Sequence, residues 1–193
     1  MRVGVLALQG AFREHILTLE ALGVSAVAVR LPTQIADVDG LIIPGGESTT
    51  IARLMHAYGF YDAIQERHAA GMAVLGTCAG AILMATHIVD AGPVQEPLGL
   101  MDISIRRNAY GRQTDSFEAD LRIAHLSEPF RGVFIRAPWI ESVGEGVETL
   151  ASHDGHVVAA RQAALLATTF HPELTGDPRM HRYFLDHIVG GNR

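Results

Sequence analysis

Gly76-Thr77-Cys78-Ala79-Gly80 stands between an apolar run, 72–75, that predicts a buried strand and a segment, 81–86, that predicts a helix. A cysteine between two glycines at a strand-to-helix turn has the form of a nucleophile elbow. The glycines allow neighbouring backbone to come close, and the helix N-terminus favours a thiolate over a thiol. The pattern predicts that Cys78 is a nucleophile. The alternative is a small buried hydrophobic side chain, which is the commonest role of a lone cysteine.

Before this turn, short apolar runs alternate with segments of helical spacing, as in βαβ units. Strands without polar residues indicate a parallel sheet that is buried on both faces. The expected strands are 3–8, 24–29 and 41–43, and the expected helices are 12–22, one that starts within 48–50 with a Ser or Thr as its N-cap, and 61–70. We therefore expect Cys78 at the carboxyl end of the sheet, where open α/β sheets bind ligands.

From Leu100 onward the pattern changes to short strands separated by turns. Asp154-Gly155 predicts a tight hairpin turn. The expected strands are 101–105, 117–123, 133–136, 147–152, 156–161 and 164–170, followed by a last helix over 177–188. No repeat or linker divides the chain, so we expect one domain over residues 1–193. The predicted fold is α/β, with a mostly parallel central sheet flanked by helices.

Composition and charge exclude several classes of partner and location. Hydrophobic residues make up 48 % of the 193 residues, and the formal net charge is −6 with no Arg-rich run. Nucleic acid and anionic membranes are therefore not expected partners. A single cysteine permits no internal disulfide. With no apolar run long enough to span a membrane and no signal-peptide pattern, we expect a cytoplasmic protein.

A nucleophilic thiolate that attacks an amide needs a group to protonate the leaving amine, and histidine is the usual choice. His171 follows the apolar strand 164–170, and Glu173 lies two residues further on. A carboxylate at that position would fix the tautomer of the imidazole and stabilise the imidazolium. By itself, His171-Pro172-Glu173 would be interpreted as a turn or a helix cap. Together with the cysteine elbow it predicts a Cys78, His171 and Glu173 triad.

The other histidines carry less weight. His153 and His156 flank the Asp154-Gly155 turn and suggest either a metal pair or a hairpin tip, and the hairpin is favoured because no second ligand pair stands nearby. We expect no metal and no organic cofactor. Six further histidines fall on predicted helices, where we expect most of them to be solvated or capping residues: His15, His56, His68, His87, His181 and His187.

Taken together, these motifs resemble the class I, or triad, glutamine amidotransferases. More closely, the chain is similar to the glutaminase subunits of pyridoxal 5′-phosphate synthase, an enzyme of vitamin B6 biosynthesis. The resemblance spans nearly the whole chain. It rests on the elbow, on His171-Pro172-Glu173 and on these further segments: Leu8-Gln9-Gly10 with Glu14-His15, 44–50, 98–100, Arg107-Asn108, 111–113, 115–118 and 134–138.

The resemblance implies hydrolysis of L-glutamine to L-glutamate and ammonia, with Cys78, His171 and Glu173 as the catalytic triad. It implies that the ammonia passes to the synthase (lyase) subunit within a hetero-oligomer. Further roles follow by position. Gly46, Glu47, Ser48, Arg107, Ile135 and Arg136 would bind the substrate, Gly46 and Ala79 would form the oxyanion hole, and Gln9 and Gly10 would lie at the partner interface.

Elementary chemistry supports these roles and also offers alternatives to them. A guanidinium such as that of Arg136 can hold the α-carboxylate of an amino acid, although a structural salt bridge is the alternative. Glu47 can hold an α-ammonium, or it can be a first-turn helix residue that the helix dipole favours. Gly45-Gly46 can bring backbone N–H groups to a ligand, or it can be only a turn.

Two other protein classes remain open at this point. One is a cysteine hydrolase or chaperone-like protein of the PfpI kind, which has the same elbow on a similar sheet. It lacks the His-Pro-Glu after the last strand and the substrate arginines, which counts against it. The other is a non-catalytic interaction subunit with a vestigial triad, although all three triad residues are present here. The sequence also leaves another acceptor enzyme for the ammonia open.

Overall fold

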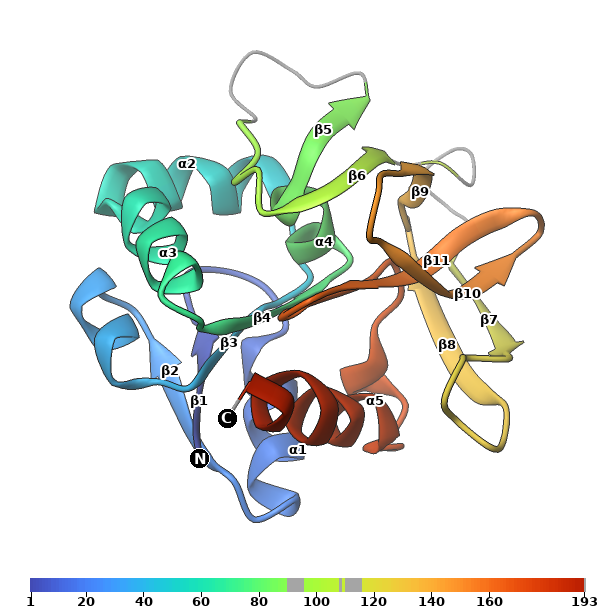
Figure 1. The fold of residues 1–193 in the computed structure, drawn as a ribbon, viewed down its shortest axis with the longest axis horizontal. Helices are drawn as coiled ribbons and strands as arrows, with labels where there is room; N and C mark the ends of the chain where they lie inside the picture. The colour runs from blue at the N-terminus through green and yellow to red at the C-terminus, as the bar shows by residue number, and fades with distance from the viewer. Residues whose placement is uncertain (90–95, 108, 110–115, 193) are drawn as a thin grey trace.

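The computed structural model describes residues 1–89, 96–107, 109 and 116–192. Its centre is a ten-stranded sheet whose first half is entirely parallel (Figure 1). Within this half, strands from both ends of the chain lie next to one another. In spatial order they are β2 (Ser25–Val29), β1 (Arg2–Leu6), β3 (Gly40–Ile43), β4 (Ala73–Thr77) and β12 (Leu165–Thr168).

The second half of the sheet is mainly antiparallel. It continues from β12 through β11 (His156–Gln162), β9 (Trp139–Val143), β6 (Met101–Arg106) and β5 (Ala85–Val89), while β10 (Glu148–His153) pairs with β11. A separate antiparallel pair consists of β7 (Ser116–Leu121) and β8 (Phe130–Ile135). The expected α/β fold with a mostly parallel central sheet is confirmed, and so is the hairpin at Asp154-Gly155.

Helices cover both faces of the sheet (Figure 1). One apolar core packs under α2 (Ser48–Tyr58), α3 (Phe60–Ala69) and α4 (Ala79–Met84). A second core packs under α1 (Phe12–Ala21) and α5 (Arg179–Tyr183), which continues as a π-helical turn over Phe184–Val189. Short 3₁₀ turns complete the chain: η1 (Pro32–Asp37), η2 (Pro172–Leu174) and η4 (Gly190–Asn192).

Three local expectations were wrong. The helix after the elbow ends at Met84, and its expected last residues, Ala85 and Thr86, begin strand β5. Strands β5 and β9 were not expected at all. The β-branched residues that follow Ala85 favour a strand, and pairing with β6 decides the matter. The N-cap of α2 is Glu47 and not a Ser or Thr, because its carboxylate accepts the Thr49 and Thr50 N–H groups.

The parallel half of the sheet gathers four loops at one edge. Strands β1, β3, β4 and β12 run in the same direction, so their carboxyl ends lie together. The loops that leave these ends carry Gln9-Gly10, Gly45-Gly46, Cys78 and His171. Thr77 and Thr168 are register partners, so Cys78 and His171 follow from two adjacent strand ends. Segments far apart in the sequence therefore meet at a single site.

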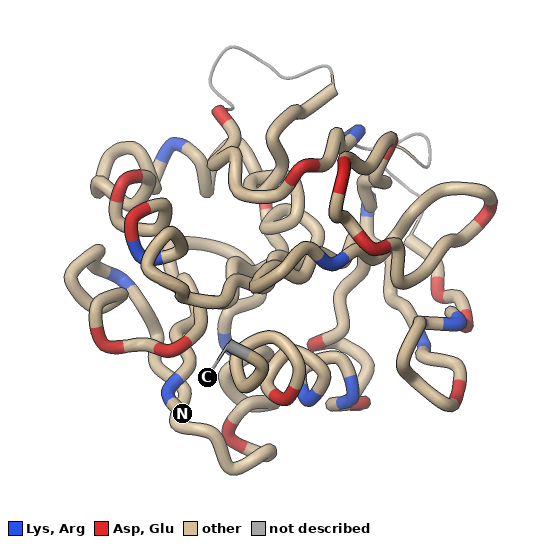
Figure 2. Tube along the Cα trace, viewed as in Figure 1, with Lys and Arg blue, Asp and Glu red and all other residues tan. Residues whose placement is uncertain are grey.

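Charged residues of both signs are interspersed along the chain (Figure 2). On the two-stranded β7–β8 sheet, for example, the Arg131 guanidinium lies 2.9 Å from a Glu118 carboxylate oxygen and 3.0 Å from one of Asp120.

In the part of the chain that the structure describes, no helix has the length and apolar character needed to cross a membrane.

Candidate active site

Cys78 occupies a strained turn between β4 and α4. Its backbone angle φ is +48°, a value that residues other than glycine rarely adopt. The backbone holds this conformation from both sides, because the Cys78 N–H donates to the Thr168 carbonyl at 2.8 Å and the Ile82 N–H donates to the Cys78 carbonyl at 3.2 Å. Strain that the surrounding structure maintains is typical of functional sites, and here it supports the predicted elbow.

The glycines of the elbow are required by close contacts. A Cβ at Gly80 would lie 1.9 Å from the Ile43 carbonyl oxygen, and a Cβ at Gly76 would lie 2.6 Å from the Gly80 carbonyl carbon. Both obstacles are backbone atoms, which cannot move aside as a flexible side chain can. The start of α4 therefore packs directly on the end of β3, which brings Cys78 close to the Gly45-Gly46 loop.

Gly80→Ala is expected to lower the free energy of unfolding by about 3 kcal/mol or more, because either α4 or β3 must shift to relieve the clash. Urea unfolding followed by circular dichroism measures this loss. Gly191→Ala is the matched control, since a Cβ there meets nothing within 4 Å, and it should stay within about 0.5 kcal/mol of the wild type. Equal stability of the two variants would contradict the close packing of α4 on β3.

His171 and Glu173 lie beside Cys78, as the sequence predicts. His171 follows β12 and its N–H donates to the Val133 carbonyl at 2.8 Å, while Glu173 lies on η2. The His171 Nδ1 lies 2.7 Å from Glu173 Oε1. The His171 ring also interacts with the Cys78 side chain. A Cβ at Gly45 would lie 2.3 Å from His171 Cε1, so this glycine makes room for the imidazole.

The electrostatics of the three residues favour a charged histidine. Burial alone would lower the pKa of His171, but its hydrogen bonds to Cys78 and Glu173 raise that pKa to about 10. Burial alone would raise the pKa of Glu173, yet interactions with His15 and His171 lower it instead. At neutral pH the arrangement therefore holds an imidazolium between a carboxylate and the sulfur of Cys78, as in cysteine hydrolases.

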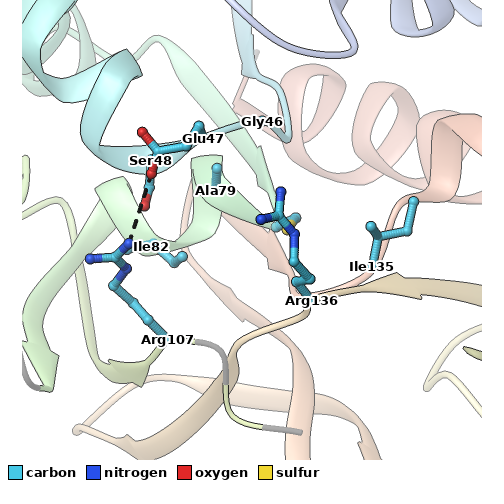
Figure 3. Close-up of a pocket in the computed structure, with 9 residues that line it drawn as sticks. Gly46, Glu47, Ser48, Ala79, Ile82, Arg107, Ile135 and Arg136 are labelled. Carbon is cyan, nitrogen blue, oxygen red and sulfur yellow. Dashed lines mark ion pairs between the residues drawn. The ribbon is translucent and has the colours of Figure 1, made fainter. Parts of the chain in front are cut away.

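A small pocket opens beside Cys78. It is lined by every residue to which the family resemblance gives a role in substrate binding or in the oxyanion hole (Figure 3). In the close-up, Arg107 and Arg136 rise from one side toward the Gly46–Ser48 segment and Ala79 on the other. The sequence did not point to Ile82, which adds an apolar wall. The lining residues are Gly46, Glu47, Ser48, Cys78, Ala79, Ile82, Arg107, Ile135 and Arg136.

Glu47 caps α2 and also lines the pocket. Its carboxylate accepts hydrogen bonds from Thr49 and Thr50 and so caps α2. Burial would raise the pKa of Glu47, but these hydrogen bonds outweigh burial and lower it to about 2. The same carboxylate lies 3.8 Å from the Arg107 guanidinium and faces the pocket (Figure 3). A fixed negative charge therefore lines the pocket at neutral pH.

The Gln9-Gly10 loop holds the Gly45-Gly46 loop in place. The Gln9 side-chain oxygen accepts the Glu47 N–H at 2.8 Å, and the Ala11 N–H donates to the Gly45 carbonyl at 3.0 Å. A Cβ at Gly10, whose φ is +96°, would lie 1.9 Å from that same carbonyl oxygen. The conformation of the predicted oxyanion loop therefore depends directly on Gln9 and Gly10.

Sequence reasoning missed two buried histidines behind the triad. His15 and His181 are both 0 % exposed, although solvated or capping roles were expected for most helical histidines. The sequence does contain a signal for each. His15 lies three residues after Phe12 and four before Leu19, and His181 lies three before Phe184, so both share the apolar faces of their helices. His87, also expected on a helix, lies on strand β5.

The histidines at the hairpin lie beside its turn. His153 and His156 are register partners next to the turn, and His156 stacks on Trp139 with ring centroids 3.6 Å apart. Across the described ranges, no group of three or more His, Cys, Asp or Glu side chains is arranged to hold a metal ion. The 111–113 segment, part of the family resemblance, lies outside the described residues, as do Asn108 and Asp115.

Comparison with known proteins gives a consistent result over almost the full chain. The family model described as the SNO glutamine amidotransferase family matches residues 5–190. A protein of Herpetosiphon aurantiacus named pyridoxal 5′-phosphate synthase subunit PdxT is 60 % identical over 96 % of this chain and 99 % of its own length. A protein of the same name from Niallia circulans is 56 % identical over 97 % of this chain and 98 % of its own.

A solved structure supports the same conclusion. A crystal structure described as a glutamine amidotransferase superposes with a TM-score of 0.92 at 51 % identity, and the match covers 97 % of this chain and 98 % of that one. The fold described above is therefore also that of an experimentally solved protein.

Proposed function

Because the chain belongs to the SNO glutamine amidotransferase family, we propose that it hydrolyses L-glutamine to L-glutamate and ammonia and delivers the ammonia to the synthase subunit of pyridoxal 5′-phosphate synthase. One observation carries the proposal. Cys78, whose side chain interacts with that of His171, lines a pocket that combines two guanidinium groups with a carboxylate. An amino-acid substrate has the complementary charges. We further propose that residues 1–193 act as one domain, since β1 and β12 share one sheet.

The reaction proceeds in two halves. The Cys78 thiolate forms a bond to the side-chain amide carbon of glutamine, and the negative charge moves onto the amide oxygen. The carbon–nitrogen bond then breaks, and His171 gives its proton to the departing ammonia. Since Nδ1 of His171 is bonded to Glu173, Nε2 is the atom that donates. In the second half, water loses a proton to His171, attacks the thioester and releases glutamate and the Cys78 thiolate.

Backbone N–H groups of Gly46 and Ala79 are the proposed oxyanion hole. Ala79 is the first residue of α4, so its N–H has no acceptor within the helix and lies at the positive end of the helix dipole. Gly46 borders the same pocket from the opposite loop. Donors fixed in this way stabilise the charge that develops in the transition state without having to reorganise.

Substrate recognition follows from the charges in the pocket. We assign the α-carboxylate of glutamine to Arg107 and Arg136, because a guanidinium binds a carboxylate through paired hydrogen bonds. Glu47, ionised at neutral pH, is assigned to the α-ammonium. Ser48 and Ile135 complete the substrate-binding wall.

The partner is proposed to act through the Gln9-Gly10 loop. Because Gln9 holds the Glu47 N–H and Gly10 packs against Gly45, a subunit that contacts this loop can change the orientation of the Gly46 peptide group. The synthase subunit would thereby switch the oxyanion hole on within the hetero-oligomer. A direct passage between the subunits would protect the neutral ammonia from protonation. We place this activity in the cytoplasm, where reducing conditions keep the Cys78 thiol free.

Glutamate release from glutamine by the purified chain tests this proposal. We expect a low rate for the chain alone and a rate at least about tenfold higher with the synthase subunit present, because activation requires the Gln9 contact to move. The matched control is Arg131→Gln, which alters an exposed arginine on the β7–β8 sheet and should behave like the wild type. Hydrolysis that does not respond to the synthase would point to a different acceptor, and no hydrolysis in either condition would refute the proposed reaction.

A further inference from the structure

Two fully buried histidines extend the triad into the protein interior. His15 on α1 and His181 on α5 are each 0 % exposed. The Nε2 atom of His15 lies 3.4 Å from Glu173 Oε2, and its Nδ1 atom lies 2.8 Å from His181 Nε2. Glu173 Oε1 is already occupied by His171. The Glu173 carboxylate is therefore placed between two imidazole rings, one on the substrate side and one on the interior side.

The positions of donors and acceptors select one tautomer for each ring. Glu173 Oε2 is buried and makes no hydrogen bond, and His15 Nε2 lies 3.4 Å away, so a proton on this nitrogen would face the unpaired carboxylate oxygen. With the proton on Nε2, the Nδ1 of His15 is an acceptor, and His181 Nε2–H supplies the donor. The opposite assignment would turn the lone pair of His15 Nε2 toward a carboxylate oxygen.

The Nδ1 atom of His181 supports the same tautomer assignment independently. This atom is buried without a hydrogen-bond partner. An unpaired lone pair costs less there than an unpaired N–H, which would lose its solvation entirely. His181 therefore carries its proton on Nε2, and the donors point in one direction, from His181 to His15 and from His15 to Glu173.

Both rings are neutral in this environment. Burial lowers the pKa of His15, and the nearby His171 lowers it further. Glu173 and Glu14 raise this pKa, but by less, so the net shift is downward. Burial, aided by the neighbouring His15, lowers the pKa of His181 to about 3. His15 therefore faces the Glu173 carboxylate as a neutral ring that can present an N–H, and not as a second positive charge, so His171 is the cation among these three histidines.

We propose that His15 and His181 are positioning residues for the glutaminase reaction: His181 fixes the tautomer of His15, and His15 holds Glu173 ionised and correctly oriented toward His171. This inference rests on the proposed function, since it assigns roles within the same site. His15 has a second contact that fits the role. Its Nε2 lies 3.2 Å from Thr77 Oγ1, which accepts the Gly45 N–H at 3.0 Å, so one ring contacts both Glu173 and the residue that precedes Cys78.

Steady-state glutamine hydrolysis with the synthase subunit present tests the proposal through His15→Leu and His15→Gln. Leucine fills the space without a donor, and we expect kcat to fall by about 10- to 100-fold, as for other residues that orient a catalytic group, with KM unchanged. The alkaline limb of the kcat profile should move to lower pH, because a poorly held Glu173 no longer raises the pKa of His171. Glutamine can keep an N–H near the position of Nε2, so His15→Gln should recover most of the activity and the original limb.

A second readout uses the unmodified chain. In a ¹⁵N NMR spectrum of the histidine rings, His15 and His181 should both show the neutral Nε2–H tautomer from pH 6 to pH 9. In His181→Leu, the His15 ring is free to adopt either tautomer, so its signals should change. The control is His56→Leu, which removes an exposed imidazole on α2 and should leave kcat, the pH profile and the His15 signals unchanged.

The outcomes separate this inference from the proposed function. If Cys78→Ala abolishes hydrolysis while His15→Leu matches the wild type in kcat and pH profile, the positioning role is wrong and the triad stands. If His15→Leu does not fold, the ring tautomers of the wild type and the kinetics of His15→Gln decide the matter. A His15 ring that is protonated on Nδ1, or that titrates between pH 6 and pH 8, would overturn the proposal.

Discussion

Cys78→Ala is expected to reduce glutamine hydrolysis by at least about 10⁴-fold, close to the background rate, because no thioester can form without the thiol. The substitution removes one atom from a residue that is almost fully buried, and the elbow is held by backbone hydrogen bonds to Thr168 and Ile82. The fold should therefore persist. Glutamate release in the presence of the synthase subunit measures the effect, with the variant and the wild type at equal concentration.

Substrate binding provides the control for this variant. Arg107, Arg136 and Glu47 are untouched, so glutamine should still bind to Cys78→Ala, and calorimetry can detect this binding. Loss of activity with binding retained would assign the chemistry to the thiol. Activity above about one-hundredth of the wild type would contradict the account. The hydroxyl of Ser48, which lines the same pocket, would then be the next candidate nucleophile.

Glu173→Gln is expected to lower kcat by about 10³- to 10⁴-fold, by analogy with other triads in which the carboxylate becomes an amide. An amide can turn an N–H toward Nδ1 of His171 and so favour the wrong tautomer. The substitution also removes a negative charge 2.7 Å from the ring. It should therefore lower the pKa of His171, which stands at about 10 in the intact site.

The pH profile tests the direction of that change. A raised pKa means that the imidazolium is present below about pH 10 and is lost as the pH rises through that value. Glu173→Gln should move this alkaline limb to lower pH. Glu47→Gln is the matched control, because it neutralises a carboxylate in the pocket that does not touch His171, so it should raise KM and leave the limb in place. An unchanged limb in Glu173→Gln would show that Glu173 does not govern His171.

Local signals explain how much of the site the sequence predicts. Glycines on both sides of a cysteine indicate a turn from local sequence, since Gly76 contacts Gly80 and the positive φ belongs to Cys78 itself, whereas the contact of Gly80 with Ile43 joins distant segments. His171 and Glu173 are two positions apart, so their contact is also local. Apolar runs that alternate with helical patterns predict a mostly parallel sheet, in which Cys78 and His171 each follow a strand, but the order of the strands comes from the structure.

Features that depend on distant parts of the chain were not predicted. The contact between His15 and Glu173 joins residues from opposite ends of the sequence, and it exists only because α1 packs beside η2. Strand β9 lies within a short, mixed segment that becomes a strand through pairing with β6. The cap of α2 depends on the rotamer of Glu47, which residue type alone does not determine.

Family membership and geometry also bear on the alternatives that the sequence left open. The match over residues 5–190 and the 51 % identical solved structure oppose a PfpI-type hydrolase. The strained backbone of Cys78 argues against a vestigial triad. A glycine at this position would adopt the same positive φ without strain, so a cysteine there indicates that the thiol is used.

Covalent labelling is the most direct test of the central claim, that the Cys78 thiolate attacks the side chain of glutamine. The purified chain, with the synthase subunit present, is treated with a glutamine analogue that carries an electrophilic carbon in place of the amide, and the products are measured by intact mass and peptide mapping. We expect one adduct per chain, on Cys78, formed more slowly when glutamine is in excess. No adduct on Cys78, or labelling of Cys78 at a rate that excess glutamine does not change, would contradict the claim.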